Sequence, residues 1–166
     1  MEKRILTLPK DKNILKKPCV DITNIDKSIV ALSDDLLETL RKSERPGVGI
    51  AAPQIGVSKN MIVIESTGWK NEKDEIVGII PAQTLINPII TKYSEERVEQ
   101  FEGCLSVPGN NGFVIRPKKI KVTAKNLDGK IIKIKASGFY SRVLQHEIDH
   151  LNGILFIDRI KDKSKL

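Results

Sequence analysis

The chain has 166 residues, of which 40% are hydrophobic, 30% are charged and 4% are aromatic. This length predicts one domain, spanning residues 1–166, with an aliphatic core that needs neither a disulfide nor a structural metal. No apolar run is long enough to cross a membrane, and the chain turns polar too early for a signal peptide, so we expect a cytoplasmic protein. The net charge is +7, but the lysines are scattered along the sequence without an aromatic-basic stripe, which argues against nucleic acid binding as the main function.

The first half of the chain predicts two helices, a compact apolar segment and a strand. A short helix is expected within residues 10–17. A longer one is expected over residues 25–44, where apolar residues recur at helical spacing and Asn24 or Asp26 can cap the start, with Pro46-Gly47 ending it. The glycine- and alanine-rich residues 47–56 suggest that backbone approaches another group closely there.

The remainder predicts mostly strands and one further helix. We expect a helix from Ser137-Gly138 to Gly153, and an α+β fold in which antiparallel β-sheets pack around this C-terminal helix. Residues 66–80 resemble a surface excursion that forms a lid or a plain loop. The predicted strands cover residues 61–65, 83–92, 97–101, 113–116, 119–126, 130–136 and 154–157, and Leu127-Asp128-Gly129 joins 119–126 and 130–136 as a hairpin.

The last predicted helix carries an H-E-x-x-H motif from His146 to His150, which contains both histidines of the chain. Because an α-helix turns about 100° per residue, the two imidazoles project from one face, one turn apart. They can share one tetrahedral metal ion, with Glu147 beside them to carry a proton. Such a motif also arises on surface helices, but the apolar neighbours Leu144 and Ile148 favour a buried one.

A catalytic metal site of this kind takes three protein ligands and leaves one position for water. The longer metalloprotease signature needs a third histidine where this chain has Phe156, and no glutamate follows Glu147. Asp158 or an upstream Cys, Asp or Glu remains open as the third ligand. We favour Cys104 because its segment is compact and flanked by glycine, with a buried inert thiol as the alternative.

Three segments stand in a recognisable order, namely Gly47–Gln54, Glu102–Ser106 and Gln145–His150. They resemble the motifs G-x-G-φ-A-A-x-Q, E-G-C-φ-S and Q-H-E-x-D-H of the peptide deformylase family, over nearly the whole chain. The resemblance implies a metal-dependent hydrolase of protein biosynthesis. Its reaction would remove the N-formyl group from the N-terminal formyl-methionine of newly synthesised proteins and release formate.

The resemblance also implies a ligand set. Cys104, His146 and His150 would hold one divalent metal ion, with water in the fourth position. Family members typically use Fe(II), which we expect in vivo, and they also accept Zn(II), Ni(II) or Co(II), since a Cys/His₂ site suits all four.

Catalytic roles follow from the same resemblance. Glu147 would act as the general base and return the proton to the departing amine. The side-chain amide of Gln54 and the backbone N–H of Leu105 would donate hydrogen bonds to the oxyanion.

Further residues would bind the substrate or support the site. Gly47 and Gly49 would let an extended peptide pair with the backbone, although they could also serve only a tight turn. Ile50, Phe139 and Val143 are the expected lining of a methionine pocket.

The supporting residues are expected near the cysteine. Glu102 and Arg116 would form the family's ion pair that steadies the cysteine loop, and Gln145 would either support the site or lie on the helix surface. Some bacterial members also carry a longer basic C-terminal helix that docks on the ribosome. Only Lys161, Lys163 and Lys165 remain of it here, so we expect at most weak ribosome docking.

The expected partners are nascent formyl-Met polypeptides, and we expect a monomer in a bacterial cytoplasm that binds neither membranes nor specific DNA. One alternative is a metallopeptidase or amidase that uses the same H-E-x-x-H site. A second is a non-catalytic, metal-stabilised binding module, in which Glu147 is incidental. A redox role for Cys104 is weaker, because no partner cysteine lies nearby in the sequence.

Overall fold

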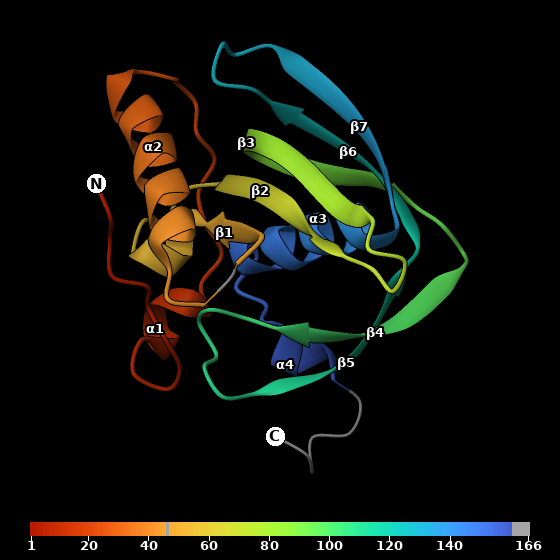
Figure 1. Cartoon of the computed structure of the whole chain (residues 1–166). Coiled ribbons are helices and arrows are strands. Elements are labelled where there is room, and N and C mark those ends of the chain that lie inside the picture. Colours follow the sequence, from red (N-terminus) through yellow and green to blue (C-terminus); the bar gives the residue numbers. More distant parts are fainter. Residues whose placement is uncertain (46, 161–166) are drawn as a thin grey trace.

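The structure, a computed structural model, describes residues 1–45 and 47–160 and has an α+β fold (Figure 1). The predictions about Pro46 and about Lys161, Lys163 and Lys165 lie outside these residues. The elements are α1 (Lys12–Leu15), α2 (Lys27–Lys42), β1 (Gly49–Ala51), a 3₁₀ turn (Ala52–Ile55), β2 (Met61–Lys70), β3 (Ile76–Tyr93), β4 (Arg97–Gly103), β5 (Asn111–Pro117), β6 (Lys119–Lys125), β7 (Ile131–Ser137), α3 (Gly138–Leu151) and α4 (Phe156–Arg159).

Two antiparallel sheets position the site. The larger sheet has the strand order β1-β2-β3-β6-β7, and the smaller one consists of β4 and β5. Helix α3 packs against strands of both sheets, as Figure 1 shows, so a side chain on this helix can reach either one. The expected arrangement of antiparallel sheets around a C-terminal helix is therefore confirmed.

Helix α2 forms where its apolar stripe predicts it. Asp26 caps the start, and its carboxylate accepts hydrogen bonds from the backbone N–H groups of Ser28 and Ile29. Leu36 and Leu40 are among the side chains that bury the apolar face against β1 and β2. This hydrophobic core beneath α2 also includes Ile50 of β1, so it fixes the position of the glycine-rich segment 47–56. None of the described helices is both long and apolar enough to span a membrane.

Strands β6 and β7 form the predicted hairpin, with Lys119 opposite Ser137 and Lys125 opposite Ile131. Alternate residues, such as Val122 and Ala136, face the core beneath α3, because successive side chains of a strand point to opposite faces. Gly129 has φ +78° and makes the tight turn at the end of the hairpin. The outer face of this hairpin is left to solvent.

The excursion predicted at residues 66–80 is not a loop. Strands β2 and β3 continue through it as a long hairpin, with Lys70 opposite Ile76 and a change of register near Ser66. The turn is organised by Asn71, whose side chain accepts hydrogen bonds from the backbone of Lys73 and Glu75. The outer half of this hairpin is exposed on both faces, so its strands are rich in glycine and polar residues. That composition is typical of a loop and led to the wrong prediction.

The strand predicted at residues 154–157 is also wrong, since Phe156–Arg159 form the short helix α4. The side chain of Asp158 accepts a hydrogen bond from the backbone N–H of Leu155, which favours a helical turn. Leu155 and Phe156 are buried together beneath the β4–β5 hairpin. A short apolar run satisfies either a strand or a helix, and here packing against β5 decides between them.

Candidate active site and metal centre

Three predicted ligands meet where α3 passes beneath the cysteine segment. The ligand atoms of Cys104, His146 and His150 all lie within 4.8 Å of one another. The helical spacing brings the imidazoles together, with ring centroids 5.1 Å apart. Cys104 follows β4, and its Sγ lies 3.3 Å from Nε2 of His150. Among the described residues these three form a potential metal-binding cluster, with a soft thiolate and two imidazoles as donors.

This donor set fits a divalent transition metal. A tetrahedral ion bound about 2.0 Å from nitrogen and 2.3 Å from sulfur would hold those two atoms roughly 3.5 Å apart. The observed separation of Cys104 and His150 is close to this value. Asp158, the other candidate for third ligand, instead pairs with Lys16 and caps α4. Phe156, which stands where the longer metalloprotease signature needs its third histidine, stacks on His146 with ring centroids 6.3 Å apart.

Glu102 lies at the centre of a buried charge cluster beside the ligands. Arg116 donates to both of its carboxylate oxygens, at 2.6 and 3.0 Å, and Arg142 donates a further hydrogen bond. Nδ1 of His146 lies 3.0 Å from Oε2 of Glu102. Burial raises the pKa of the Glu102 carboxyl, but the hydrogen bonds from His146 and Arg116 outweigh burial and hold this pKa well below its ordinary value. A proton on Nδ1 leaves Nε2 of His146 with its lone pair for a metal.

The cluster extends further than the predicted Glu102–Arg116 pair. Arg116 also donates to Asp149 on α3, at 2.8 Å, and Arg159 on α4 binds the same carboxylate. Arg142, only 8% exposed, donates to backbone carbonyls of β4 and β5 as well as to Glu102. The sequence gives no signal for these partners, because a charged residue on a helix normally indicates a solvent-exposed face.

Gln145 supports the helix rather than lying on its surface. It is 4% exposed, and its amide donates to the carbonyl oxygen of Pro117 at 2.9 Å and to Ser141. The hydrogen bond to Pro117 fixes α3 to the end of β5, the strand that carries Arg116. Of the two roles considered for Gln145, the structure supports the internal one.

Glu147 has a very different environment from Glu102. Its side chain is 4% exposed, and its Oε2 has no hydrogen-bond partner among the described residues. Burial, the largest influence, raises the pKa of the Glu147 carboxyl to about 7, and a cation bound nearby would lower it again. A carboxylate that titrates near neutral pH is suited to accept and return a proton.

Gly49 makes room for this carboxylate. A Cβ atom at position 49 would lie 2.6 Å from Oε1 of Glu147 and 2.7 Å from its Cγ. No real Cβ contact is this close, so the side chain of Glu147 occupies the space that glycine leaves. The glycine-rich segment was predicted to allow a close approach to its backbone, and the group that approaches Gly49 is the side chain of Glu147.

Gln54 is 1% exposed and points at the cysteine segment. Its Oε1 accepts a hydrogen bond from the backbone N–H of Ala51, which fixes the orientation of the amide. Its Nε2 is then a donor, 3.1 Å from Oγ of Ser106 and 3.8 Å from Sγ of Cys104. Leu105, the residue after Cys104, lines the cavity that opens over the predicted ligands.

A cavity of about 480 Å³ opens over the ligands and Glu147. Four of the five predicted substrate-binding residues line it, namely Gly47, Gly49, Phe139 and Val143. Ile50 does not, because its fully buried side chain lies in the core beneath α2. Successive residues of a strand point to opposite faces, so Gly49 and Ile50 cannot both face the cavity.

Comparison with known proteins identifies the family. The family model described as "Polypeptide deformylase" matches residues 2–166. The chain belongs to this family. A "Peptide deformylase" of Halothermothrix orenii is 46% identical over 147 residues, which cover 89% of this chain and 87% of that protein.

Solved structures of the family share the fold. The peptide deformylase of Ehrlichia chaffeensis has a TM-score of 0.87 at 36% sequence identity, covering 99% of this chain and 91% of that one. The class I type b peptide deformylase of Acinetobacter baumannii, solved with Met-Ala-Ser bound, has a TM-score of 0.83 at 35% identity, covering 96% and 99%. The chain is thus a hydrolase with peptide deformylase activity, and the expectation from the sequence is confirmed over the peptidase and the non-catalytic binding module.

Proposed function

We propose that this family member hydrolyses the formamide bond of formyl-methionine at the start of newly made polypeptides. Water adds to the formyl carbon, the C–N bond breaks, and formate and a free amine leave. One observation carries the proposal: the ligand atoms of Cys104, His146 and His150 lie within 4.8 Å of one another, beside Glu147, whose Oε2 has no hydrogen-bond partner among the described residues. A divalent metal held by these three ligands would supply Lewis acidity and lower the pKa of water.

We infer that Glu147 is the general base. Its buried carboxylate lines the cavity, and within the described part of the chain one of its oxygens has no hydrogen-bond partner, so it can take a proton from the attacking water. The protonated carboxyl can then donate that proton to the departing amine nitrogen, which leaves Glu147 unchanged after one turnover. Because Gly49 has no side chain, the carboxylate can lie against the β1 backbone beside the substrate.

The oxyanion of the tetrahedral intermediate would receive two hydrogen bonds. Nε2 of Gln54 is held as a donor through the hydrogen bond that its Oε1 accepts from Ala51. The backbone N–H of Leu105 would be the second donor. Donors fixed before the reaction cost no reorganisation when the charge develops, and losing one typically costs about 3 kcal/mol of barrier.

The substrate would bind as an extended chain along Gly47 and Gly49, with its methionine side chain against Phe139 and Val143. The Met-Ala-Ser found on the A. baumannii relative is the product expected from a formylated Met-Ala-Ser peptide. A methionine side chain matches an apolar wall of this kind because its thioether is flexible and weakly polar.

For the remaining features we follow the family resemblance. We propose Fe(II) as the physiological metal, although the Cys/His₂ donor set also suits Zn(II), Ni(II) and Co(II). We propose that residues 1–166 form a single catalytic domain, active as a monomer in a bacterial cytoplasm. Relatives from bacteria such as H. orenii support that setting. Nascent formyl-Met chains would be its partners, with at most a weak contribution from ribosome docking.

The test is hydrolysis of formyl-Met-Ala-Ser by protein loaded anaerobically with Fe(II) or with Ni(II), followed by release of formate. We expect rapid turnover that is lost in Glu147→Ala and kept in a matched variant of an exposed glutamate on β4, Glu99→Ala. Acetyl-Met-Ala-Ser and unformylated Met-Ala-Ser should remain intact. Cleavage of the Met–Ala bond, or turnover by Glu147→Ala at the wild-type rate, would contradict the proposal.

A further inference from the structure

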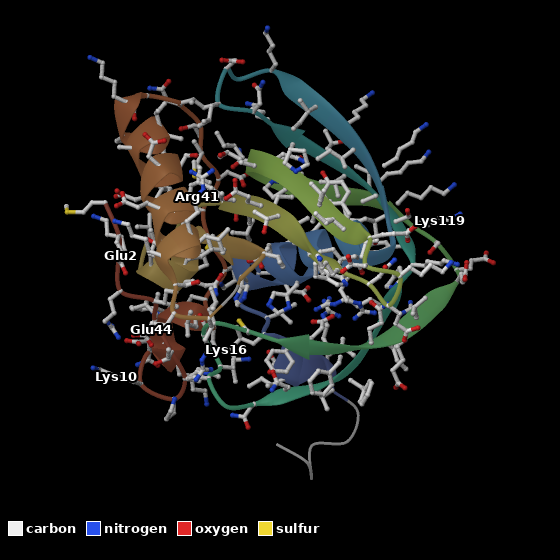
Figure 2. The ribbon with its side chains drawn as sticks, viewed as in Figure 1. Glu2, Lys10, Lys16, Arg41, Glu44 and Lys119 are labelled. Atoms are coloured by element: carbon white, nitrogen blue, oxygen red, sulfur yellow. The ribbon has the colours of Figure 1, made fainter. Side chains whose placement is uncertain are left out.

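The lysines that look scattered in the sequence gather on one face of the larger sheet. Alternate residues of β6 and β7 point away from α3, and the outward positions include Lys119, Lys121, Lys133 and Lys135, all exposed. Lys92 of β3 joins them. These five residues are called the lysine face below. Figure 2 shows nitrogen-tipped side chains projecting outward from this part of the sheet, with Lys119 labelled at its edge.

Three of these lysines form a row across the strands. Lys121 lies directly opposite Lys92 on one side and opposite Lys135 on the other. Adjacent strands are about 4.8 Å apart, so the row places three like charges within roughly 10 Å. Like charges directly opposite each other destabilise a sheet. Within the part of the chain that the structure describes, none of the five lysines forms an ion pair with a carboxylate that would offset this cost.

The row borders a groove on the outer surface of the sheet. Its volume is about 390 Å³, and four members of the lysine face line it, together with the hydroxyl-bearing Ser94 and Ser137. Glu96 lies two residues after Ser94 in the sequence, but its carboxylate is paired with Lys118, which is not part of the lysine face. The Ser94 hydroxyl donates to the carbonyl oxygen of Glu96, so the groove offers chiefly ammonium donors, without a competing carboxylate in its lining.

Protection of a sheet edge does not account for this arrangement. Natural sheets place lysine on edge strands to prevent pairing with other chains, and β7 is an edge strand. Lys121, however, lies on β6 between Lys92 of β3 and Lys135 of β7, so it is paired on both sides; Lys92 lies beyond the part of β3 that pairs with β2. The charge of Lys121 at least therefore contributes to a face rather than to an edge.

We propose that the lysine face binds the phosphate backbone of double-stranded RNA. Lysines about 7 Å apart along a strand and about 5 Å apart across strands form a grid, and their flexible stems let each ammonium reach a separate phosphate. Contacts of this kind release counterions, carry no sequence preference and suit a backbone held at regular spacing.

The composition of the face selects among polyanions. Single-stranded nucleic acid is usually bound through stacking of its bases on aromatic residues, and Tyr93 is the only aromatic residue that lines the groove among the described residues. Anionic membranes are usually bound by an amphipathic helix that carries basic residues on its polar face and inserts its apolar face. The lysine face instead lies on paired strands, although Tyr93, Ile120 and Ala136 also line the groove. An ordered duplex backbone requires only the array of charges.

The lysine face is separate from the catalytic centre. Its strands bury their opposite side chains, including Ile120 and Val122, against the core beneath α3. Binding of RNA would therefore leave turnover of a short formylated peptide unchanged. An effect on RNA binding can consequently be distinguished from any failure of catalysis.

The test is fluorescence anisotropy of a labelled RNA duplex of about 16 base pairs, the length that a double-stranded RNA-binding domain spans. Protein with the triple substitution Lys92→Gln, Lys121→Gln and Lys135→Gln is compared with wild type across a salt series. We expect the variant to bind at least about tenfold more weakly. The slope of log affinity against log salt should fall by about 3, one per lysine removed.

A charge-matched control removes three exposed lysines elsewhere, through Lys10→Gln, Lys12→Gln and Lys27→Gln. Lys10 lies on the opposite side of the molecule from Lys119 in Figure 2. This variant should bind the duplex as wild type does, and both variants should deformylate formyl-Met-Ala-Ser normally. Equal weakening in both variants, no binding by wild type, or binding to phosphatidylserine vesicles but not to RNA would each overturn the proposal.

Discussion

The two buried glutamates beside the proposed metal ligands have opposite environments in the fold. Glu102, on β4, receives hydrogen bonds from Arg116 and Arg142 and lies against His146, and its pKa is held well below the ordinary value. Glu147, on α3, has one oxygen without any partner among the described residues, and burial raises its pKa to about 7. A carboxylate saturated with donors stabilises structure, whereas one left without donors can exchange a proton.

The largest effect should come from Glu147→Gln. The amide keeps the size of the side chain but cannot accept the proton of water, so we expect kcat to fall about 10³-fold. The free energy of unfolding should stay the same or rise, because the substitution removes a buried carboxylate with one oxygen that no described residue hydrogen-bonds. Steady-state deformylation and urea unfolding measure the two quantities, with Glu99→Gln as the control for an exposed glutamate. A large loss of stability would show that Glu147 is structural after all.

Glu102→Gln should instead act on stability. The substitution leaves Arg116 and Arg142 buried without their full countercharge, which costs about 3–5 kcal/mol of unfolding free energy. Metal affinity should also weaken about 10- to 100-fold, because His146 loses its orienting partner. The matched control is Glu96→Gln, whose exposed pair with Lys118 contributes at most about 1 kcal/mol. Equal stability losses in the two variants would remove the distinction between Glu102 and a surface glutamate.

Gly49→Ala tests how closely the backbone holds Glu147. The added methyl group would lie 2.6 Å from Oε1 of Glu147, so the carboxylate must move. A displacement of about 1 Å can cost about 100-fold in rate, and we expect kcat to fall by that order with metal content unchanged. Metal analysis of the purified variant separates this effect from damage to the ligands. Wild-type kcat in Gly49→Ala would mean that the position of Glu147 is less constrained than the structure indicates.

The smallest effect is expected at the rim of the charge cluster. Arg159 binds Asp149, but its side chain is 41% exposed and Asp149 keeps its hydrogen bond from Arg116. We therefore expect Arg159→Gln to lower the free energy of unfolding by no more than about 1 kcal/mol. Chemical denaturation measures this change. A loss of unfolding free energy as large as that of Glu102→Gln would show that the ion pair from α4 contributes as much as the buried charge cluster.

The sequence predicts much of this arrangement where local signals are strong. The cap at Asp26, the hairpin turn before Gly129 and the histidine spacing on α3 each follow from short-range rules. The three linked motifs also predicted that Cys104, Gln54 and the two histidines lie in one site. Their roles in catalysis remain proposals.

Features that depend on packing between distant segments could not be predicted. Arg142 and Asp149 look like surface charges on a helix until β4, β5 and α4 surround them. Ile50 resembles a pocket residue by its position in the motif, yet strand alternation directs it into the core. The lysine face likewise exists only through strand register, which places Lys92 opposite Lys121 although their residue numbers differ by 29.

The most direct test of the central claim is a metal titration of Glu147→Gln combined with a single-turnover assay on formyl-Met-Ala-Ser. Our account predicts one metal per chain at wild-type affinity, an unchanged Kd for the peptide, and formate release slowed about 10³-fold. These results would assign Glu147 to proton transfer and the three ligands to the metal. Formate release within tenfold of wild type, or loss of the metal, would contradict the division of roles between Glu147 and Glu102.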